Sequence, residues 1–323
     1  MKTLYLHVGP HKTGSTYLQK LWIANRHLLK DNGLVYPEVF TKYYGHHKLA
    51  EHLIDSNYNA SYKAGIEQLK KIPEDIILSS EDFILVNKEG FQKLKEDLNG
   101  IDIKVVFYFR SPTVRFLSEW QEMIKHGYSI DFFEHYFKRT MKIFQSSELN
   151  YSLWFDMFID LFGMDNVKII DYENAFKSSQ MMANFEKILD KNIIADENIL
   201  VNTMLDLSTV EIIRILNYKA SKDGLLSGLN VREKFVKLLD NKEINIEKLS
   251  ELIKQHNSVV MLGQGMIDKH MYNQINTVYG ECLVNELAEL KEIQYELPST
   301  LWLEDKNVQS EITQLYKQIK DAL

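Results

Sequence analysis

The feature that most constrains the fold is a loop near the start of the chain. It is bounded by two glycines and reads Gly9-Pro10-His11-Lys12-Thr13-Gly14-Ser15-Thr16. A β-rich run over residues 3–8 leads into the loop, and apolar residues at helical spacing follow from residue 17 to residue 22. Strand, tight turn and helix in this order open a parallel α/β fold. The N-terminus of the helix offers backbone N–H groups and the positive end of its dipole to an anion.

The rest of the chain supports this fold class. Buried strands are expected at residues 35–36, 75–80, 103–109 and 167–170, and helices at 64–71, 91–98 and 149–162. Strands that alternate with helices predict an α/β fold, a parallel sheet with helices on both faces. After about residue 193 the strand signals fade, and helices are expected at 208–217, 246–255, 272–292 and 305–323. The chain therefore reads as a single domain over residues 1–323 with a helical C-terminal third.

The loop differs from the phosphate loop of ATPases in the place of its lysine. The glycines at 9 and 14 fit the pattern G-x-x-x-x-G-K-[ST], but Ser15 stands where that pattern has lysine. The cation of the loop is Lys12, Gly14 allows close approach of the backbone, and Ser15 and Thr16 add hydroxyl donors. We expect a phosphate-like ester other than ATP here. The alternative is a plain glycine turn before a capped helix.

A second candidate anion site follows the strand at 103–109. Arg110 stands at the carboxyl end of that strand, where α/β folds place ligands. Pro112 suits the first turn of a helix, and Ser118 then lies about two turns into it. An arginine forks onto phosphate oxygens, and a serine hydroxyl donates to the same group. Arg115 either lines this site or pairs with an acid. Two anion sites together imply one ligand with anionic groups at both ends.

On these residues the chain resembles the sulfotransferases that use 3′-phosphoadenosine 5′-phosphosulfate (PAPS). The segment His11–Thr16 looks like their 5′-phosphosulfate loop, and Arg110-Ser111-Pro112 through Ser118 looks like their 3′-phosphate motif. Looser similarity to bacterial, carbohydrate-sulfotransferase-like members lies at 33–37 with 46–47, at 151–172 and at 202–217. The resemblance covers about residues 1–220.

The resemblance implies a P-loop NTPase-like fold, with a nucleotide-binding α/β core over about residues 1–220 and a helical extension over about 221–323. PAPS is then the co-substrate, and 3′-phosphoadenosine 5′-phosphate is the product. The 5′ end would be held by Lys12, Thr13, Gly14, Ser15 and Thr16. The 3′-phosphate would be held by Arg110 and Ser118, and no metal is expected. Residues 221–232 match, loosely, a basic loop that closes over the nucleotide.

The reaction expected from this resemblance is in-line transfer of the sulfuryl group from PAPS to an acceptor hydroxyl. Lys12 would stabilise the charge on the leaving phosphate, and His11 would touch the sulfate. A base assists the attack of a hydroxyl, and Glu81, after the strand at 75–80, is our first choice because carbohydrate-modifying members use a Glu after a similar strand. The alternative for Glu81, or for Asp82, is that it caps the next helix. His46 and His47 compete as the base or bind the acceptor.

The acceptor is left open by the sequence. A glycan or glycolipid hydroxyl is preferred, and a small-molecule or lipid alcohol is the alternative. The rival classes are a P-loop kinase or NTPase, and a non-catalytic nucleotide-binding or scaffold protein. A kinase needs lysine at position 15 and an acid that binds Mg²⁺ after a strand, whereas Arg110 follows the strand at 103–109.

Composition narrows the setting of the protein. A net charge of −7 argues against a nucleic-acid partner. The single cysteine, Cys282, forms no internal disulfide and is expected to pack in a helix. Residues 1–8 do not read as a signal segment, and no run approaches the ~20 apolar residues of a membrane span. We therefore expect a cytoplasmic protein without a membrane span, with a possible homo-oligomer through the C-terminal helices.

Overall fold

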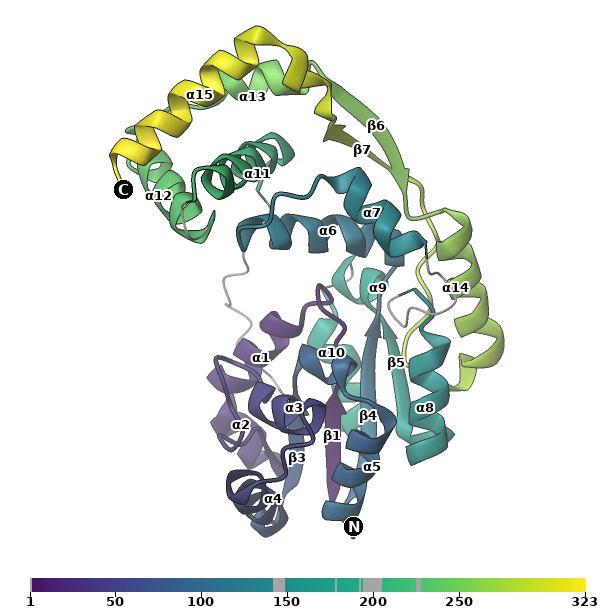
Figure 1. Ribbon diagram of the computed structural model, residues 1–323. Coiled ribbons are helices and arrows are strands. Elements are labelled where there is room, and N and C mark those ends of the chain that lie inside the picture. The colour runs from purple at the N-terminus through teal and green to yellow at the C-terminus, as the bar shows by residue number, and fades with distance from the viewer. Residues whose placement is uncertain (1, 142–148, 178, 192, 194–204, 225–227) are drawn as a thin grey trace. The chain divides into compact units, whose positions relative to one another are not determined.

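The computed structural model describes residues 2–141, 149–177, 179–191, 193, 205–224 and 228–323 (Figure 1). Contacts divide the chain into two compact units. The first unit is formed by Met1–Ser111, Phe144–Val201 and Lys269–Glu289, and the second by Pro112–Ile143, Asn202–Asp268 and Leu290–Leu323. The chain thus leaves each unit and returns to it more than once. None of the described helices has the length and apolar character needed to cross a membrane.

The first unit is built on a parallel sheet of five strands in the order β2-β3-β1-β4-β5 (Figure 1). The strands are β1 (Thr3–His7), β2 (Leu34–Val35), β3 (Asp75–Ser79), β4 (Asp102–Phe109) and β5 (Val167–Asp171). On the central strand, Leu6 is paired with Leu78 of β3 and with Val105 of β4. All three side chains are fully buried, as expected for a parallel sheet covered on both faces.

Helices cover both faces of this sheet. They are α1 (Ser15–Ala24), α2 (Arg26–Asp31), α3 (His47–Ile54), α4 (Ala60–Lys71), α5 (Lys88–Asp97), α8 (Ser152–Phe162), α9 (Tyr172–Lys177) and α10 (Met181–Leu189), with a 3₁₀ turn η1 (Glu81–Leu85) after β3. On one face, Trp22 of α1 and Phe185 of α10 pack in one cluster with Tyr108 of β4. On the other, Phe155 of α8 meets Phe107, the neighbour of Tyr108 that points the opposite way.

This topology marks one edge of the sheet as a place for a ligand. The chain leaves β1 for α1 on one face, whereas it leaves the adjacent strand β3 for η1 and α5 on the face of α8, where Phe91 contacts Phe158. Adjacent parallel strands whose connections part to opposite faces leave a crevice at their carboxyl ends. The loop at residues 9–16 and the acids after β3 both lie at these ends. The expected α/β fold with helices on both faces is confirmed.

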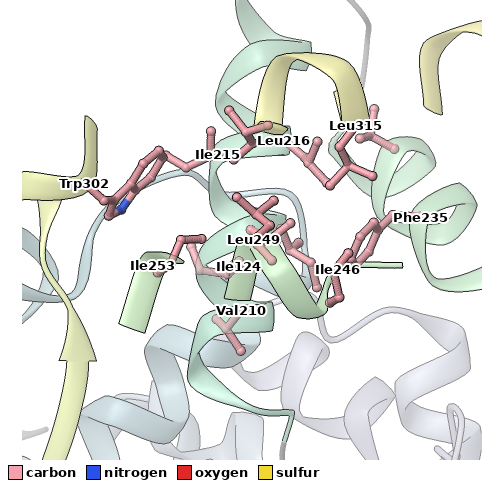
Figure 2. Packing of buried hydrophobic residues seen from close by; sticks show 14 of the residues in the cluster. Ile124, Val210, Ile215, Leu216, Phe235, Ile246, Leu249, Ile253, Trp302 and Leu315 are labelled. Atoms are coloured by element: carbon pink, nitrogen blue, oxygen red, sulfur yellow. The ribbon is translucent and has the colours of Figure 1, made fainter. Parts of the chain in front are cut away.

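The second unit is mainly helical. It contains α6 (Pro112–Lys125), α7 (Phe132–Thr140), α11 (Leu207–Lys222), α12 (Gly228–Asp240), α13 (Glu247–Lys254), α15 (Lys306–Asp321), and an antiparallel pair, β6 (Asn257–Leu262) and β7 (Ile293–Pro298). Figure 2 shows Leu216 of α11, Leu249 of α13 and Leu315 of α15 in its apolar core. The amphipathic C-terminal helix therefore buries its apolar face within its own unit.

Three features of the C-terminal part differ from the sequence expectations. Strands β6 and β7 were not predicted, although Ile293–Leu297 alternates apolar and polar residues as a strand does. The helix expected over 272–292 is α14 (Met266–Val278), which ends much earlier. The chain beyond it instead lies along β5, where Val284 N donates to Ile169 O at 2.9 Å and Asn285 bonds to the backbone of Asp171. The backbone beside the edge strand gains hydrogen bonds that a longer helix would have left unmade.

Cys282 is a packing residue. It lies in a short 3₁₀ turn (Gly280–Cys282) rather than in an α-helix, and its side chain is buried against Met164. Burial raises the pKa of its thiol. A buried thiol of raised pKa is a poor nucleophile.

Candidate active site

The loop after β1 has the backbone of an anion-binding turn. Lys12 and Gly14 both have left-handed backbone angles, with φ of 68° and 80°. Glycine adopts the angle of Gly14 without strain, and the tip of the Met181 side chain from α10 packs against it, 2.7 Å from where a Cβ atom would lie. Gly14 caps α1 without a side-chain hydrogen bond. The cap residue therefore has no side chain that would compete with an anion for the first N–H groups of the helix.

The three hydroxyl residues of the loop differ in their burial and in their hydrogen bonds. Thr13 is fully buried and its Oγ1 donates to Pro10 O at 2.6 Å, so this hydroxyl holds the turn together. Ser15 is also buried, at 5% exposure, yet its Oγ has no hydrogen-bond partner. Thr16 is exposed. A buried hydroxyl without a partner is costly, and it is satisfied when a ligand accepts its hydrogen bond.

The carboxyl end of β3 lies directly against this loop. A Cβ atom on Gly9 would be 3.0 Å from Glu81 Cα, and Ser80 N donates to His7 O at 3.1 Å. The alternative that Glu81 or Asp82 caps a helix is wrong. Ser80 caps η1, because its Oγ accepts from Asp82 N, and Asn87 caps α5. Neither carboxylate is used as a cap, and both lie at the carboxyl end of β3.

Two histidines meet at Asp82. Nδ1 of His47 lies 2.8 Å from Asp82 Oδ2 and 2.9 Å from Ser80 Oγ, and Nε2 of His11 lies 3.5 Å from Asp82 Oδ1. The hydrogen bonds from His11 and His47 hold the pKa of Asp82 well below its usual range. Burial lowers the pKa of His47, but its hydrogen bond to Asp82 and the charges of Glu81 and Asp82 outweigh burial, so the net shift is upward. The result is an ionised carboxylate between two imidazoles.

Gln19 is a site residue that the sequence analysis missed. Its Nε2 donates to Glu81 Oε2 at 2.9 Å and to Ser79 Oγ at 3.1 Å, and so fixes Glu81 from the side of α1. Gln19 is 1% exposed and lies one helical turn after Ser15. The sequence signal that could have identified Gln19 is its spacing of four residues from Ser15, which places both side chains on one face of the helix.

His46 and His47 are neighbours in sequence but have different surroundings. His46 is fully buried, its Nδ1 accepts from Ser79 N at 3.1 Å, and its Nε2 donates to Pro37 O at 3.0 Å. Burial lowers its pKa to about 4. Both ring nitrogens are hydrogen-bonded in the interior, so His46 links β3 to the loop at Pro37. Of the two histidines proposed to bind the acceptor, only His47 has its ring at the crevice.

Arg110 lies at the phosphate loop itself. Its Nη1 donates to Lys12 O at 2.7 Å, and its Nε pairs with Glu173 Oε1 at 3.0 Å. The guanidinium stands over the ring of Tyr172, 4.8 Å from its centre. A planar guanidinium can stack on an aromatic ring and donate two hydrogen bonds in fixed directions. A lysine in place of Arg110 would do neither. Arg110 thus joins the loop after β1 to the end of β5.

The remaining predicted residues belong to the second unit or lie partly outside the described residues. Ser118 is half-buried on α6. Its pairing with Arg110 stays a prediction. Arg115 is buried beside Glu119, at 3.8 Å, which favours its structural alternative. The basic segment at 221–232 includes residues 225–227, outside the described residues, and Arg232 is helical in α12. Within the described ranges, no group of three His, Cys, Asp or Glu side chains is placed to hold a metal ion.

Comparison with known proteins finds a likeness to a solved structure. No protein-family model matches the chain, and no curated protein matches it. A crystal structure of a sulfotransferase from Alicyclobacillus acidocaldarius is similar with a TM-score of 0.40 and 15% sequence identity, over 68% of this chain and 96% of that one. The case for a function therefore rests on the residues of the site.

Proposed function

We propose that this protein is a sulfotransferase that uses PAPS and transfers its sulfuryl group to an acceptor hydroxyl. The observation that carries the proposal is the buried, unpartnered Oγ of Ser15 at the start of α1, at the same end of the sheet as Glu81, Asp82 and His47. The loop suits an anionic ester, and the residues after β3 suit a proton acceptor. In-line transfer between an anionic donor and a hydroxyl needs both.

In this proposal the loop binds the 5′-phosphosulfate. The N–H groups at the start of α1, the hydroxyls of Ser15 and Thr16, and the ammonium of Lys12 would hold its oxygens, and Lys12 would stabilise the charge that develops on the leaving phosphate. Thr13 and Gly14 shape the turn. Arg110 and Ser118 are proposed for the 3′-phosphate.

The preferred acceptor is a hydroxyl of a glycan or glycolipid, and the alternative is a small-molecule or lipid alcohol. An aliphatic hydroxyl holds its proton tightly, so it needs the base that the Glu81 side of the crevice supplies. The rival reading as a P-loop kinase is less favoured. Ser15 replaces the lysine of that loop, and the buried Asp171 at the end of β5 already accepts from the backbone of Asn174 and Ala288.

The test is calorimetric titration with 3′-phosphoadenosine 5′-phosphate, the desulfated product, without added Mg²⁺. We expect micromolar binding that is tighter than that of ATP and that weakens at least tenfold in Lys12→Ala and in Arg110→Ala, about 1.4 kcal/mol or more. Lys63→Ala is the matched control, because Lys63 is exposed on α4. A preference for ATP that requires Mg²⁺ would favour the kinase, and no binding of either nucleotide would favour the scaffold.

A further inference from the structure

We propose that Asp82 is a positioning residue that turns the Nε2 atom of His47 toward the acceptor hydroxyl, and that His47 is the base that takes the proton. This inference rests on the proposed function and names the base within it. Glu81, the first choice from the sequence, then stabilises the protonated imidazole rather than receiving the proton itself.

The first support is the geometry of the His47 ring. An ionised carboxylate only accepts hydrogen bonds, so the 2.8 Å contact between Nδ1 and Asp82 Oδ2 places the ring proton on Nδ1. Ser80 fixes this arrangement, since its Oγ accepts from Asp82 N at 3.1 Å and lies 2.9 Å from Nδ1. The neutral ring then carries its lone pair on Nε2. Orientation of an imidazole by a carboxylate on its far nitrogen is how a histidine base is held in the productive tautomer.

The second support is the partner of Glu81. Its Oε2 already accepts a hydrogen bond from Gln19 Nε2 at 2.9 Å, and it lies 3.9 Å from His47 Nε2. This distance is too long for a hydrogen bond in the neutral state, but it is short enough for strong attraction once Nε2 carries a positive charge. The side chain of Glu81 is 17% exposed, so the attraction is only partly screened by water. The carboxylate is thus placed to stabilise the imidazolium.

The third support is the backbone at the approach to Nε2. A Cβ atom on Gly45 would lie 2.7 Å from His47 Nε2, 2.8 Å from Gln19 Nε2 and 3.0 Å from Ser79 O. The φ angle of Gly45 is not in the left-handed region, so its absence of a side chain is a matter of space. A glycine at this point leaves the space that the His47 ring and the Gln19 amide occupy. Any larger residue would displace the ring from its place.

The charges that face the His47 ring come from three elements. Glu81 and Asp82 of η1 raise its pKa, and Lys42, before α3, lowers it. His46 precedes it in the chain and is held neutral by burial, and His11 reaches the same Asp82 from the loop after β1. Burial also lowers the pKa of His47, but the hydrogen bond to Asp82 and the two acids outweigh burial and Lys42, so the net shift is upward. A base of raised pKa takes a proton from an alcohol more readily.

The step balances as a single displacement. The acceptor oxygen forms a bond to the sulfur of PAPS while the bond from sulfur to the 5′-phosphate oxygen breaks. The electron pair of that bond leaves with 3′-phosphoadenosine 5′-phosphate, where Lys12 meets the new charge. The proton of the acceptor hydroxyl passes to Nε2 of His47, and Asp82 and Glu81 stabilise the resulting cation.

Nuclear magnetic resonance of the ¹⁵N-labelled histidines tests the positioning role without any acceptor. In the native protein we expect the His47 proton on Nδ1 and a pKa above the ordinary 6.5. Asp82→Asn should lower that pKa and mix the tautomers, whereas Glu81→Gln should lower the pKa and leave the proton on Nδ1. Exposed His126 serves as the internal reference. A proton on Nε2 in the native protein, or a His47 signal unchanged by Asp82→Asn, would overturn the proposal.

The slow release of 3′-phosphoadenosine 5′-phosphate from PAPS in water, where water takes the place of the acceptor, tests which residue is the base. We expect His47→Gln to lower this rate by about 10²-fold or more and Glu81→Gln to lower it less. His52→Gln, on the same helix and bonded only to the Asn57 carbonyl, is the matched control. A larger loss in Glu81→Gln than in His47→Gln would make Glu81 the base.

Calorimetry separates failure of this inference from failure of the proposed function. All variants should bind 3′-phosphoadenosine 5′-phosphate as the native protein does, because the residues changed are not among those proposed to hold this nucleotide. If the native protein does not bind this nucleotide, the sulfotransferase proposal fails. If it binds, but the proton of His47 is on Nε2 or Glu81→Gln loses more activity than His47→Gln, only the assignment of the base fails.

Discussion

The two units of the molecule each hold a carboxylate among nitrogen donors, and they use it differently. In the second unit, Glu211 is 2% exposed; its oxygens accept from Arg214 Nε and Nη2, both at 2.7 Å, and from Trp302 Nε1 at 2.9 Å. In the first unit, the side chain of Asp82 is 31% exposed and lies between two imidazoles.

The difference lies in what the partners can do. A guanidinium and an indole N–H keep their protons at any physiological pH, so the Glu211 cluster is a fixed link between α11 and η4 (Thr300–Glu304). Imidazoles gain and lose protons near neutral pH, so the Asp82 cluster can exchange a proton with something in the crevice. Burial with permanent donors makes a structural carboxylate, and partial exposure among titratable donors makes one fit for chemistry.

The largest effect we expect is from Glu211→Ala. The change leaves the Arg214 guanidinium buried without its partner, which costs about 3–5 kcal/mol of the free energy of unfolding. Urea unfolding followed by circular dichroism measures it. Nucleotide binding should be retained in the folded protein, because the loop and Asp82 lie in the first unit.

Glu251→Ala is the matched control for this prediction. Glu251 pairs with Lys254 at the same spacing of three residues, but both side chains are in water. We expect no measurable change in stability. An equal loss in the two variants would mean that burial of the Glu211 pair is not what matters.

The next prediction compares two buried hydroxyls of the phosphate loop. Thr13→Val removes the bond to Pro10 O and should lower stability by about 1 kcal/mol. Ser15→Ala removes a hydroxyl that has no partner, so it should leave stability unchanged or raise it. Ser15→Ala should instead weaken binding of 3′-phosphoadenosine 5′-phosphate by about 1.5–3 kcal/mol, the usual contribution of a hydrogen bond to a charged group.

Thermal unfolding measures the stability of the Thr13→Val and Ser15→Ala variants, and calorimetry measures their affinity for the nucleotide. A loss of stability in Ser15→Ala with unchanged affinity would show that its hydroxyl belongs to the fold, and would remove the observation on which the proposed function rests.

The sequence predicted the first unit better than the second, for a physical reason. Buried parallel strands are short, continuous apolar runs, and β3 and β4 stand out in the sequence in this way. Strand β6 is half-exposed and pairs only with β7, about 30 residues later, so nothing in its neighbourhood marks it. The division into two units depends on contacts between segments far apart in the chain, which local patterns do not encode.

At the site, the sequence named candidate residues but not their arrangement, and it did not name Gln19. Lys12, Ser15, Glu81 and His47 became candidates from their places after strands and in the loop. What decided between the neighbours His46 and His47 was the direction of each ring, and that depends on Ser79, Pro37 and Asp82. Asp82 was interpreted as a candidate helix cap, because the sequence does not show that Ser80 and Asn87 are the caps.

The smallest expected effect is on the pH dependence of stability, and it separates the two neighbouring histidines. The folded-state pKa of His46 is about 4, below the ordinary 6.5, so the unfolded chain binds its proton first. His46 therefore stabilises the fold fully above pH 6.5, and this contribution falls by about 1.4 kcal/mol per pH unit as the pH drops toward 4. His47, whose folded pKa is raised, contributes stability below 6.5 that is lost as the pH rises through its folded value. Urea unfolding between pH 4.5 and pH 7.5 should thus show a flatter acid limb in His46→Asn. In His47→Asn the acid limb should keep its slope, and the decline in stability above pH 6.5 should be smaller. The same change of pH profile in both variants would mean that the two rings share one environment, and the contrast between a structural histidine and a base would be lost.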